Sequence, residues 1–268
     1  MNQLNGQIML PGIDDHFLNE RLEESRRVVA QVAAMSEKPL IIQFSGGRDS
    51  MAMVELVREV TDNFVACYMI SGIDFPESVA FAGESAAKLQ VPIIYSRPED
   101  HKGGLFQRLE QFGKWPAVRS LWCQRDLKVR AEKKRLNKTF GRGTFYKLVG
   151  VRRYESNRRK YIYPLNMFMR KDPDVTSDVQ VFPIVHWTGD DVKNYLAMKK
   201  SPESSLYKKY GVSGCYWCPF YQHDIYRSVL ADHPDRYDEF IWWEKKLQIP
   251  SIINNTFLRD LKAQIVVE

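Results

Sequence analysis

A short glycine-containing turn that follows an apolar run is the feature that most restricts the fold of this chain. Residues 39–44 form a short, mainly apolar run, and residues 51–57 have helical composition. The turn between them consists of Ser45, Gly46, Gly47, Arg48, Asp49 and Ser50. This order predicts a strand, a tight turn and a helix. Glycine lets backbone N–H groups approach a ligand closely and a helix start favours negative charge, so the turn predicts a phosphate-binding site.

The same turn differs from the Walker phosphate-binding loop. The Gly-x-x-x-x-Gly-Lys spacing and its lysine are absent, so we expect different chemistry. The alternative interpretation is an ordinary turn in which Asp49 or Ser50 only caps a helix.

The surrounding segments alternate between strand-like and helix-like patterns. Strands are predicted at 64–70, 91–95 and 145–151, and helices at 15–35 and 78–89. Such alternation predicts an α/β fold with a Rossmann-like parallel sheet and flanking helices, in which ligands bind beyond the carboxyl ends of the strands. We divide the chain into an N-terminal helix (1–36), an α/β domain (37–200) and a cysteine-bearing helical C-terminal region (201–268).

Composition limits the class of protein. With 44% hydrophobic residues among 268, the chain can bury one sizeable core. Residues 1–15 lack the features of a signal peptide and no run is long enough to cross a bilayer, so we expect a cytoplasmic protein without a membrane partner. Two of the four cysteines, Cys215 and Cys218, have a Cys-x-x-Cys spacing, which favours metal or redox chemistry over secreted disulfides.

Basic residues are clustered in the middle of the chain. The formal net charge is +6. The first cluster consists of Lys128, Arg130, Lys133, Lys134, Arg135, Lys138 and Arg142, and the second of Arg152, Arg153, Arg158, Arg159 and Lys160. Both clusters fit a polyanionic partner, with DNA favoured and RNA as the alternative. The first run is equally typical of the solvated face of a helix.

Three segments resemble known families. Residues 44–50 resemble the Ser-Gly-Gly-x-Asp-Ser loop of the N-type ATP pyrophosphatases, which have an adenine nucleotide alpha-hydrolase-like fold. Residues 150–159 are similar to the Gly-x-Arg-x-x-Glu-Ser-x-x-Arg element of the phosphoadenylylsulfate reductase branch, and residues 182–192 resemble its Pro-Ile-x-x-Trp-Thr-x-x-Asp-Val element. This resemblance implies that the loop grips the pyrophosphate of ATP while a substrate attacks the α-phosphorus.

The resemblance also assigns roles to residues. Ser45, Asp49 and Arg152 are the expected catalytic residues, with Asp49 nearest a Mg²⁺ ion that neutralises developing charge. Arg152, Ser156 and Arg159 are expected beside the nucleotide phosphates, because guanidinium groups bind phosphate with planar, bidentate geometry. The alternative is a set of surface arginines. We expect Trp187 in the core and Thr188 at a helix cap.

The cysteines leave several interpretations open. In the iron–sulfur members of this branch, cysteines similar to Cys123, Cys215 and Cys218 hold a [4Fe–4S] cluster, which implies three ligands here. A zinc site completed by His223 and a redox dithiol are the alternatives. Cys67 lies in a predicted apolar strand and is assigned to the core.

The predicted function is the activation of an oxygen for replacement by sulfur. Residues 113–128 are similar to a region of pyrophosphatases in bacterial DNA phosphorothioation systems, which implies DNA as acceptor, a cysteine desulfurase as sulfur donor and further DNA-modification subunits. A tRNA-thiolating enzyme, a sulfonucleotide reductase and a non-catalytic nucleotide-binding subunit are the alternatives. The reductases carry a catalytic cysteine in a Glu-Cys-Gly-x-His tail that residues 261–268 do not contain, which argues against reduction.

Overall fold

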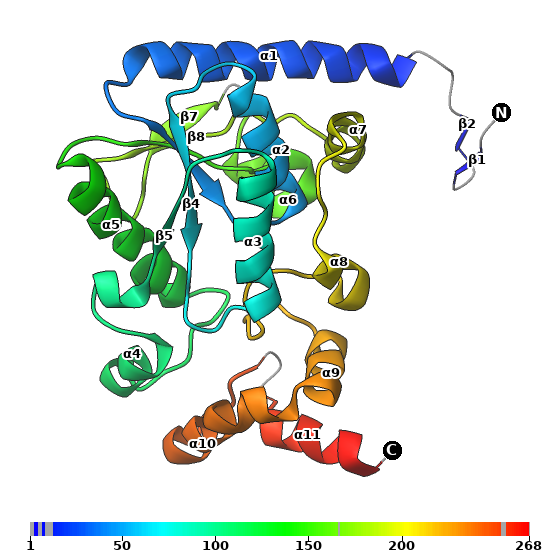
Figure 1. The fold of residues 1–268 in the computed structure, drawn as a ribbon. Helices are drawn as coiled ribbons and strands as arrows, with labels where there is room; N and C mark the ends of the chain where they lie inside the picture. The colour runs from blue at the N-terminus through cyan, green and yellow to red at the C-terminus, as the bar shows by residue number, and fades with distance from the viewer. Residues whose placement is uncertain (1–2, 5–6, 9–12, 166, 253–255, 268) are drawn as a thin grey trace.

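A six-stranded sheet forms the centre of the molecule in the computed structural model, which describes residues 3–4, 7–8, 13–165, 167–252 and 256–267 (Figure 1). The strands are β3 (Leu40–Phe44), β4 (Phe64–Met69), β5 (Ile93–Ser96), β6 (Tyr146–Leu148), β7 (Met169–Lys171) and β8 (Val179–Val181). Their order is β5-β4-β3-β6-β8-β7. All neighbours are parallel except β7 and β8. The predicted Rossmann-like α/β fold is confirmed, with one antiparallel edge strand added.

Side chains of β3 alternate between two cores, as the two-residue period of a strand requires. Leu40 and Ile42 pack with α2 (Arg48–Arg58) in the larger core. Ile41 points to the other face, where it packs with Leu136 of α5 (Arg130–Phe140). Because β3 pairs with β4 on one side and β6 on the other, it is buried at the centre of the sheet.

Helices cover both faces of the sheet. The larger core also receives side chains from α1 (Ile13–Met35), α3 (Pro76–Lys88) and α7 (Gly189–Lys199), whereas α5 covers the opposite face (Figure 1). Trp187 is fully buried in the larger core, and Thr188 caps α7 by accepting the Asp191 N–H at 3.1 Å, which confirms both expectations.

The C-terminal region is helical, as expected, and forms a second core with segments from the middle of the chain. Its helices are α8 (Ser205–Tyr210), α9 (His223–Asp232), α10 (Asp238–Leu247) and α11 (Leu258–Val267). The middle segments are α4 (Leu105–Phe112) and a π-helical turn, η2 (Cys123–Val129). The remaining elements are β1 (Gln3–Leu4), β2 (Gln7–Ile8), η1 (Pro98–Asp100), η3 (Arg153–Glu155), α6 (Asn157–Ile162) and η4 (Pro234–Tyr237). None of the described helices combines the length and apolarity needed to cross a bilayer.

Element boundaries differ from the sequence predictions near the glycine turn. Helix α2 begins at Arg48, because extended Gly47 serves as its N-cap and Asp49 places negative charge in the first turn. The last three residues of the predicted turn therefore belong to the helix. Of the predicted strand 145–151, β6 covers Tyr146–Leu148. The Phe145 carbonyl accepts the Val179 N–H at 3.0 Å and Val149 N–H donates to the Val181 carbonyl at 2.9 Å, and the chain then leaves the sheet toward the turn.

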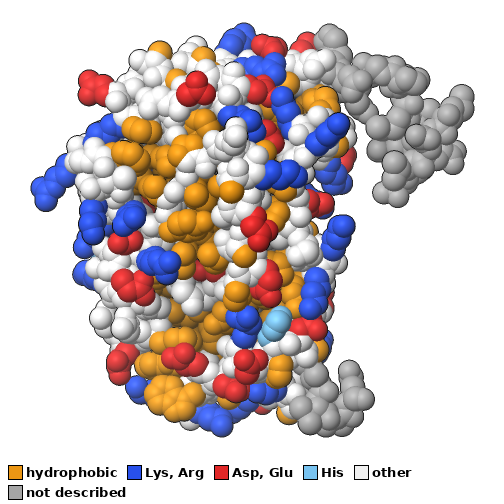
Figure 2. All heavy atoms as spheres, in the orientation of Figure 1, with side chains coloured by type: hydrophobic (Ala, Val, Ile, Leu, Met, Phe, Trp, Pro, Cys, Tyr) orange, Lys and Arg blue, Asp and Glu red, His pale blue; other side chains and the backbone are white. Residues whose placement is uncertain are grey.

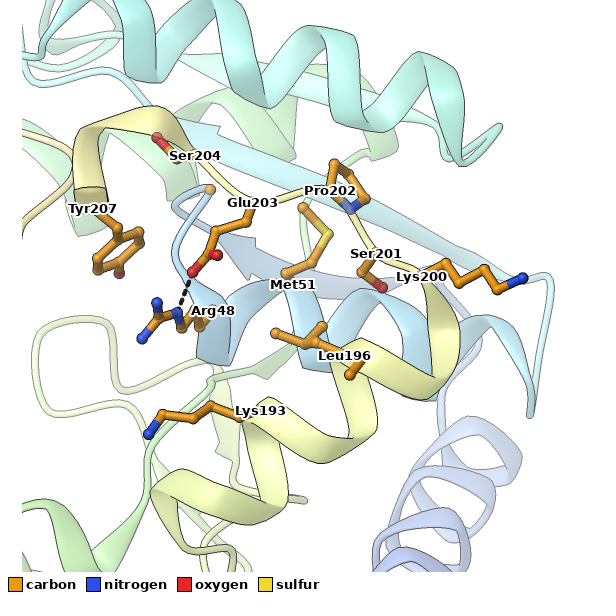
Figure 3. Close-up of a pocket in the computed structure, with 12 residues that line it drawn as sticks. Arg48, Met51, Lys193, Leu196, Lys200, Ser201, Pro202, Glu203, Ser204 and Tyr207 are labelled. Atoms are coloured by element: carbon orange, nitrogen blue, oxygen red, sulfur yellow. Dashed lines mark hydrogen bonds and ion pairs between the residues drawn. The ribbon is translucent and has the colours of Figure 1, made fainter. Parts of the chain in front are cut away.

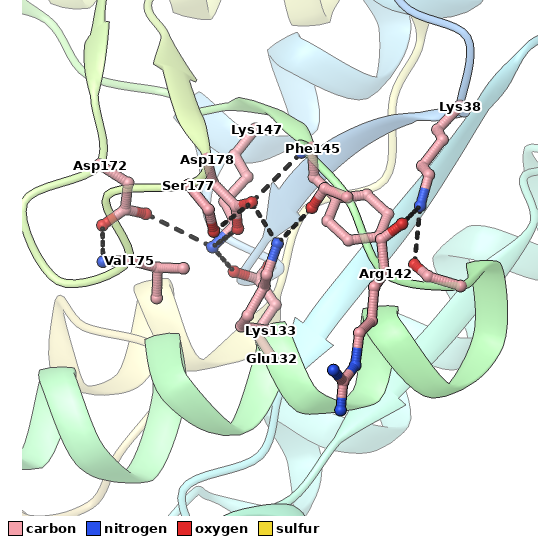
Figure 4. Close-up of polar contacts among 12 residues, drawn as sticks. Lys38, Glu132, Lys133, Arg142, Phe145, Lys147, Asp172, Val175, Ser177 and Asp178 are labelled. Carbon is pink, nitrogen blue, oxygen red and sulfur yellow. Dashed lines mark hydrogen bonds and ion pairs between the residues drawn. The ribbon is translucent and has the colours of Figure 1, made fainter.

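A buried group of charges joins α5, β6 and the β7–β8 hairpin (Figure 4). The Lys147 Nζ lies 3.0 Å from Glu132, 3.4 Å from Asp172 and 3.1 Å from Asp178, and all four side chains are fully buried. Burial acts to lower the pKa of Lys147, but the three carboxylates outweigh it and hold that pKa above its ordinary value. Lys133 lies 2.5 Å from Asp178 and adds a second cation.

Candidate nucleotide-binding site

The glycine turn lies where β3 ends, beside the ends of β4 and β6. Gly46 has φ = 72°, a left-handed conformation that glycine adopts without a steric penalty. Ser50, which is 5% exposed, fixes the turn from inside: its Oγ accepts the Ser45 N–H at 3.1 Å and donates to the Gly47 carbonyl at 2.9 Å. The exposed Ser45 is left at the surface of the turn. The turn is therefore preorganised.

The segment that follows β6 contacts the turn directly. Arg152 Nε donates to Asp49 Oδ1 at 2.8 Å, so two of the predicted catalytic residues meet. Gly150 allows this approach, because a Cβ there would lie 2.9 Å from both the carbonyl carbon and the oxygen of Asp49. Gly189 lies behind the arginine, with a hypothetical Cβ 3.7 Å from Arg152 Nη1. The arrangement places one guanidinium at the glycine turn.

The two other residues predicted beside the phosphates are engaged in local structure. Ser156 is the N-cap of α6 and accepts the Arg159 N–H at 3.2 Å. The Arg159 side chain pairs with Glu155 at 2.6 Å. These contacts order the short segment after Arg152, and a phosphate role for Ser156 and Arg159 stays a prediction.

The C-terminal region contributes residues that sequence reasoning missed. Tyr207 of α8 lies over the turn, since a Cβ on Gly47 would be 2.8 Å from its hydroxyl and 3.7 Å from the Ser213 Oγ. Arg48 lies 5.1 Å from the Tyr207 ring centroid and bonds to Glu203. Tyr207 and Ser213 belong to no motif, so only the tertiary structure reveals them.

A pocket of ≈ 360 Å³ opens beside the turn, between α2, α7 and α8 (Figure 3). Met51 and Leu196 contribute apolar surface. Arg48 and Lys193 lie on one side of the opening and Lys200 extends from the other. Glu203 also lines the pocket and pairs with Arg48, and Lys193 pairs with Asp190. The volume is within the range of small-ligand pockets.

Cys215 lies at the end of β4, on the side of the sheet where the turn lies. It pairs with Asp74 in an isolated antiparallel bridge, and its Sγ lies 3.2 Å from Ser71 Oγ and 3.4 Å from Lys128 Nζ. Burial acts to lower the pKa of Lys128, but the charges of Cys215 and Asp74 outweigh it and raise that pKa above its ordinary value. Lys128, predicted as part of a basic surface run, instead points toward Cys215.

The other two candidate ligands lie near Cys215. Burial, followed by the charge of Cys215, raises the pKa of the Cys123 thiol to about 12, and burial also raises the pKa of Cys218. Among the described residues, no three cysteine, histidine or acidic side chains are placed as ligands of one metal ion. Metal binding requires converging thiolates, so the arrangement of these thiols does not by itself form a cluster or zinc site. Cys67 is fully buried, as expected of a core residue.

The first basic cluster does not form one charged face. Lys133 pairs with Asp178, and Arg130 pairs with Asp126 at 2.9 Å. Lys134, Lys138 and Arg142 are exposed. Figure 2 shows hydrophobic side chains along the middle of one face of the molecule, with Lys and Arg side chains mainly toward its edges. The structure therefore divides this cluster between internal ion pairs and solvent.

Comparisons with known proteins place this geometry in context. The profile described as phosphoadenosine phosphosulfate reductase domain matches residues 39–221. Adenosine 5′-phosphosulfate reductase 2 of Bacillus subtilis is 24% identical over 67% of this chain and 72% of its own length. Sulfate adenylyltransferase subunit 2 of Burkholderia lata is 27% identical over 70% of this chain and 67% of its own.

Longer relatives and a solved structure complete the comparison. Two uncharacterized proteins of Methanocaldococcus jannaschii are 26% and 25% identical over 74% and 79% of this chain, but the chain spans only 46% and 42% of their lengths. The crystal structure of phosphoadenylyl-sulfate reductase from Candida auris, a phosphate complex, has a TM-score of 0.51 at 18% identity, covering 78% of this chain and 98% of that one. It shares the fold. Since the matched profile spans more than half of the sequence, this chain belongs to the phosphoadenosine phosphosulfate reductase domain family.

Proposed function

We propose that the chain is an ATP pyrophosphatase that adenylylates an oxygen of its substrate so that sulfur can replace that oxygen. The observation that carries the proposal is the 2.8 Å bond from Arg152 to Asp49, which holds a guanidinium at the phosphate-binding turn. Sulfate adenylyltransferase subunit 2, a relative, supports chemistry on ATP. The acceptor oxygen attacks the α-phosphorus, the bond to the bridging oxygen breaks, and pyrophosphate leaves.

The residues of the turn have separate roles in this reaction. The backbone N–H groups of the turn, at the start of α2, bind the pyrophosphate next to the Tyr207 hydroxyl, which lies 2.8 Å from where a Cβ on Gly47 would stand. Arg152 stabilises the negative charge that accumulates on the leaving pyrophosphate. A bound Mg²⁺ would neutralise further phosphate charge, and Asp49 is the carboxylate in the turn that could face it.

The acceptor belongs to the proposal as well. We favour a non-bridging oxygen of the DNA backbone, with sulfur delivered by a cysteine desulfurase and with further DNA-modification subunits as partners. The support is the similarity of residues 113–128 to DNA phosphorothioation pyrophosphatases and the cationic segment that follows Arg152. Thiolation of tRNA uses the same activation and differs only in the acceptor.

The test measures pyrophosphate release under anaerobic conditions with ATP and Mg²⁺, in the presence of DNA, tRNA or no acceptor. Replacing Arg152 with alanine should lower the rate by about 10²-fold or more, the usual loss on removing a preorganised transition-state donor. Arg58→Ala is the matched control, because Arg58 is exposed and is the last residue of α2, at the end of the helix opposite the turn. Equal rates for the two variants and the unmodified chain would remove Arg152 from the mechanism.

Reduction of a sulfonucleotide is the second candidate, favoured by the similarity to adenosine 5′-phosphosulfate reductase 2. Sulfite release from adenosine 5′-phosphosulfate with a dithiol reductant, without consumption of ATP, would establish it in place of the first. An iron, sulfide and zinc count on anaerobically purified protein decides between the metal interpretations of Cys123, Cys215 and Cys218. A Cys123→Ser variant with an unchanged metal content would exclude that residue as a ligand.

A further inference from the structure

The segment directly after Arg152 combines uncompensated cations with exposed aromatic rings. Residues 152–162 contain five arginines and lysines and one carboxylate, Glu155. That carboxylate pairs with Arg159. Among the described residues, no carboxylate is paired with Arg153, Arg158 or Lys160. Arg158 and Lys160 are exposed. The segment therefore presents net positive charge to solvent beside the turn.

Two tyrosines of the same segment face solvent. Tyr161 of α6 is 90% exposed and Tyr154 of η3 is 46% exposed. The Tyr154 ring lies 5.5 Å from the Arg153 guanidinium and 5.9 Å from the Lys160 ammonium, so it helps to position these cations. The Tyr161 ring has nearly its whole surface available. A large aromatic side chain this exposed loses hydrophobic stabilisation unless another planar or apolar group covers it.

The geometry points to a single-stranded nucleic acid segment as the occupant of this surface, with phosphates on Arg158 and Lys160 and a base stacked on Tyr161. Proteins that bind single strands combine such cations with aromatic platforms, because every unstacked base offers a π face. A duplex buries its bases and could use only the cations. This inference rests on the proposed function in one respect: it identifies the acceptor as a single-stranded nucleic acid that passes Arg152 and reaches the turn.

The location of the surface fits that path. Arg152, which bonds to Asp49 of the turn, is followed directly by η3 and, after the capping residue Ser156, by α6. The Ser156 cap holds the start of α6, so the cations and Tyr161 stand on an ordered element next to the site. A strand bound there would bring one of its backbone oxygens or bases close to the reacting phosphate.

The experiment measures binding of fluorescently labelled oligonucleotides about 12 nucleotides long to the full chain by anisotropy, at several salt concentrations. Single-stranded DNA, single-stranded RNA, duplex DNA of the same sequence and heparin are compared. We expect both single strands to bind more tightly than the duplex, and heparin binding to be insensitive to the aromatic ring. Tyr161→Ala should weaken single-strand binding by roughly 5- to 150-fold, whereas Tyr161→Phe, which keeps the ring, should retain it.

A matched pair of charge reversals locates the surface. Arg158→Glu with Lys160→Glu should abolish most binding and flatten its salt dependence, since each lost phosphate contact lowers the salt slope by about 1. Lys134→Glu with Lys138→Glu makes the same change in net charge on exposed positions of α5 and should bind nearly as the unmodified chain does. Equal loss in both pairs, or single-strand binding that survives Tyr161→Ala, would overturn the inference.

The remaining outcomes separate this inference from the proposed function. If the unmodified chain binds none of the nucleic acids at low salt, the surface serves another partner, such as a protein, and the inference fails. ATP binding is measured in parallel on the same preparations. Loss of nucleotide chemistry with intact, Tyr161-dependent strand binding would reject the proposed function and leave the surface assigned.

Discussion

At the scale of single residues, the candidate site depends on places where a side chain is absent as much as on those where one is present. Gly150 lies where the end of β6 meets the turn, and its missing Cβ lets the Asp49 backbone come close. Arg152, two residues later, could be predicted from its motif. Gly150 belongs to the same motif. A glycine is needed there because two backbone segments approach each other closely, and sequence spacing does not reveal such an approach. Tyr207 and Ser213 could not be predicted, because they reach the turn only through the packing of α8.

Replacing Gly150 with alanine should therefore displace the turn. The new Cβ would stand 2.9 Å from the Asp49 carbonyl, and overpacking of this kind costs about 1–3 kcal/mol. ATP affinity should fall by about tenfold for each charge-assisted hydrogen bond that the displaced turn loses. Calorimetric titration with ATP and Mg²⁺ measures this loss directly.

Gly104→Ala is the matched control for that substitution. Gly104 has an ordinary φ, and no atom lies within 4 Å of the position that an added methyl group would occupy, so alanine there meets open space. Its ATP affinity should stay close to that of the unmodified chain. Its unfolding free energy should fall by about 1 kcal/mol at most, because Gly104 is the N-cap of α4, where alanine is less favourable than glycine. If Gly150→Ala binds ATP equally well, the end of β6 does not fix the turn.

At the scale of elements, the buried charges attach the β7–β8 edge of the sheet to α5. Lys147 of β6 binds carboxylates from α5 and from the β7–β8 hairpin. The central strands could be predicted from the sequence, because their apolar runs are long enough to be recognised as strands. The hairpin was missed, since β7 and β8 have three residues each, too few to show the two-residue period of a strand. The burial of Glu132 could not be predicted either, because its neighbours form a basic run typical of a solvated helix.

Replacing Lys147 with methionine should be severely destabilising. The change leaves Glu132, Asp172 and Asp178 buried beside one another, with Lys133 as the cation paired to Asp178. Breaking a buried ion group by removing one partner costs about 3–5 kcal/mol. Urea unfolding followed by circular dichroism measures the difference. Lys171→Met, on an exposed position of β7, should stay within about 0.5 kcal/mol. Comparable losses in both variants would show that the ion group contributes nothing beyond a surface charge.

At the scale of the whole molecule, backbone hydrogen bonds link the predicted C-terminal region, 201–268, to the segment that follows β4. Phe75 N–H donates to the Gly214 carbonyl at 2.7 Å and Tyr216 N–H donates to Ile73 at 2.9 Å, so the C-terminal region is joined to the end of β4 by backbone bonds. The second core likewise combines middle and C-terminal segments. The helical character of 201–268 could be predicted from its sequence. The backbone bonds to the segment after β4 could not, because they are long-range contacts that no local sequence pattern encodes.

Because these backbone bonds link the C-terminal region to the segment after β4, we expect the two cores to unfold together. Ser78 of α3 accepts the Gly214 N–H at 2.9 Å and is 2% exposed, so Ser78→Ala leaves a buried donor unpaired and should cost about 1–3 kcal/mol. Ser85 lies on the same helix, equally buried, and its Oγ has no partner among the described residues, so Ser85→Ala should cost little. In a Trp187→Phe background, fluorescence reports mainly the second core and circular dichroism reports both. Ser78→Ala should shift both midpoints equally, because one cooperative unit has one transition; a shift in fluorescence alone would mean that the C-terminal region unfolds independently.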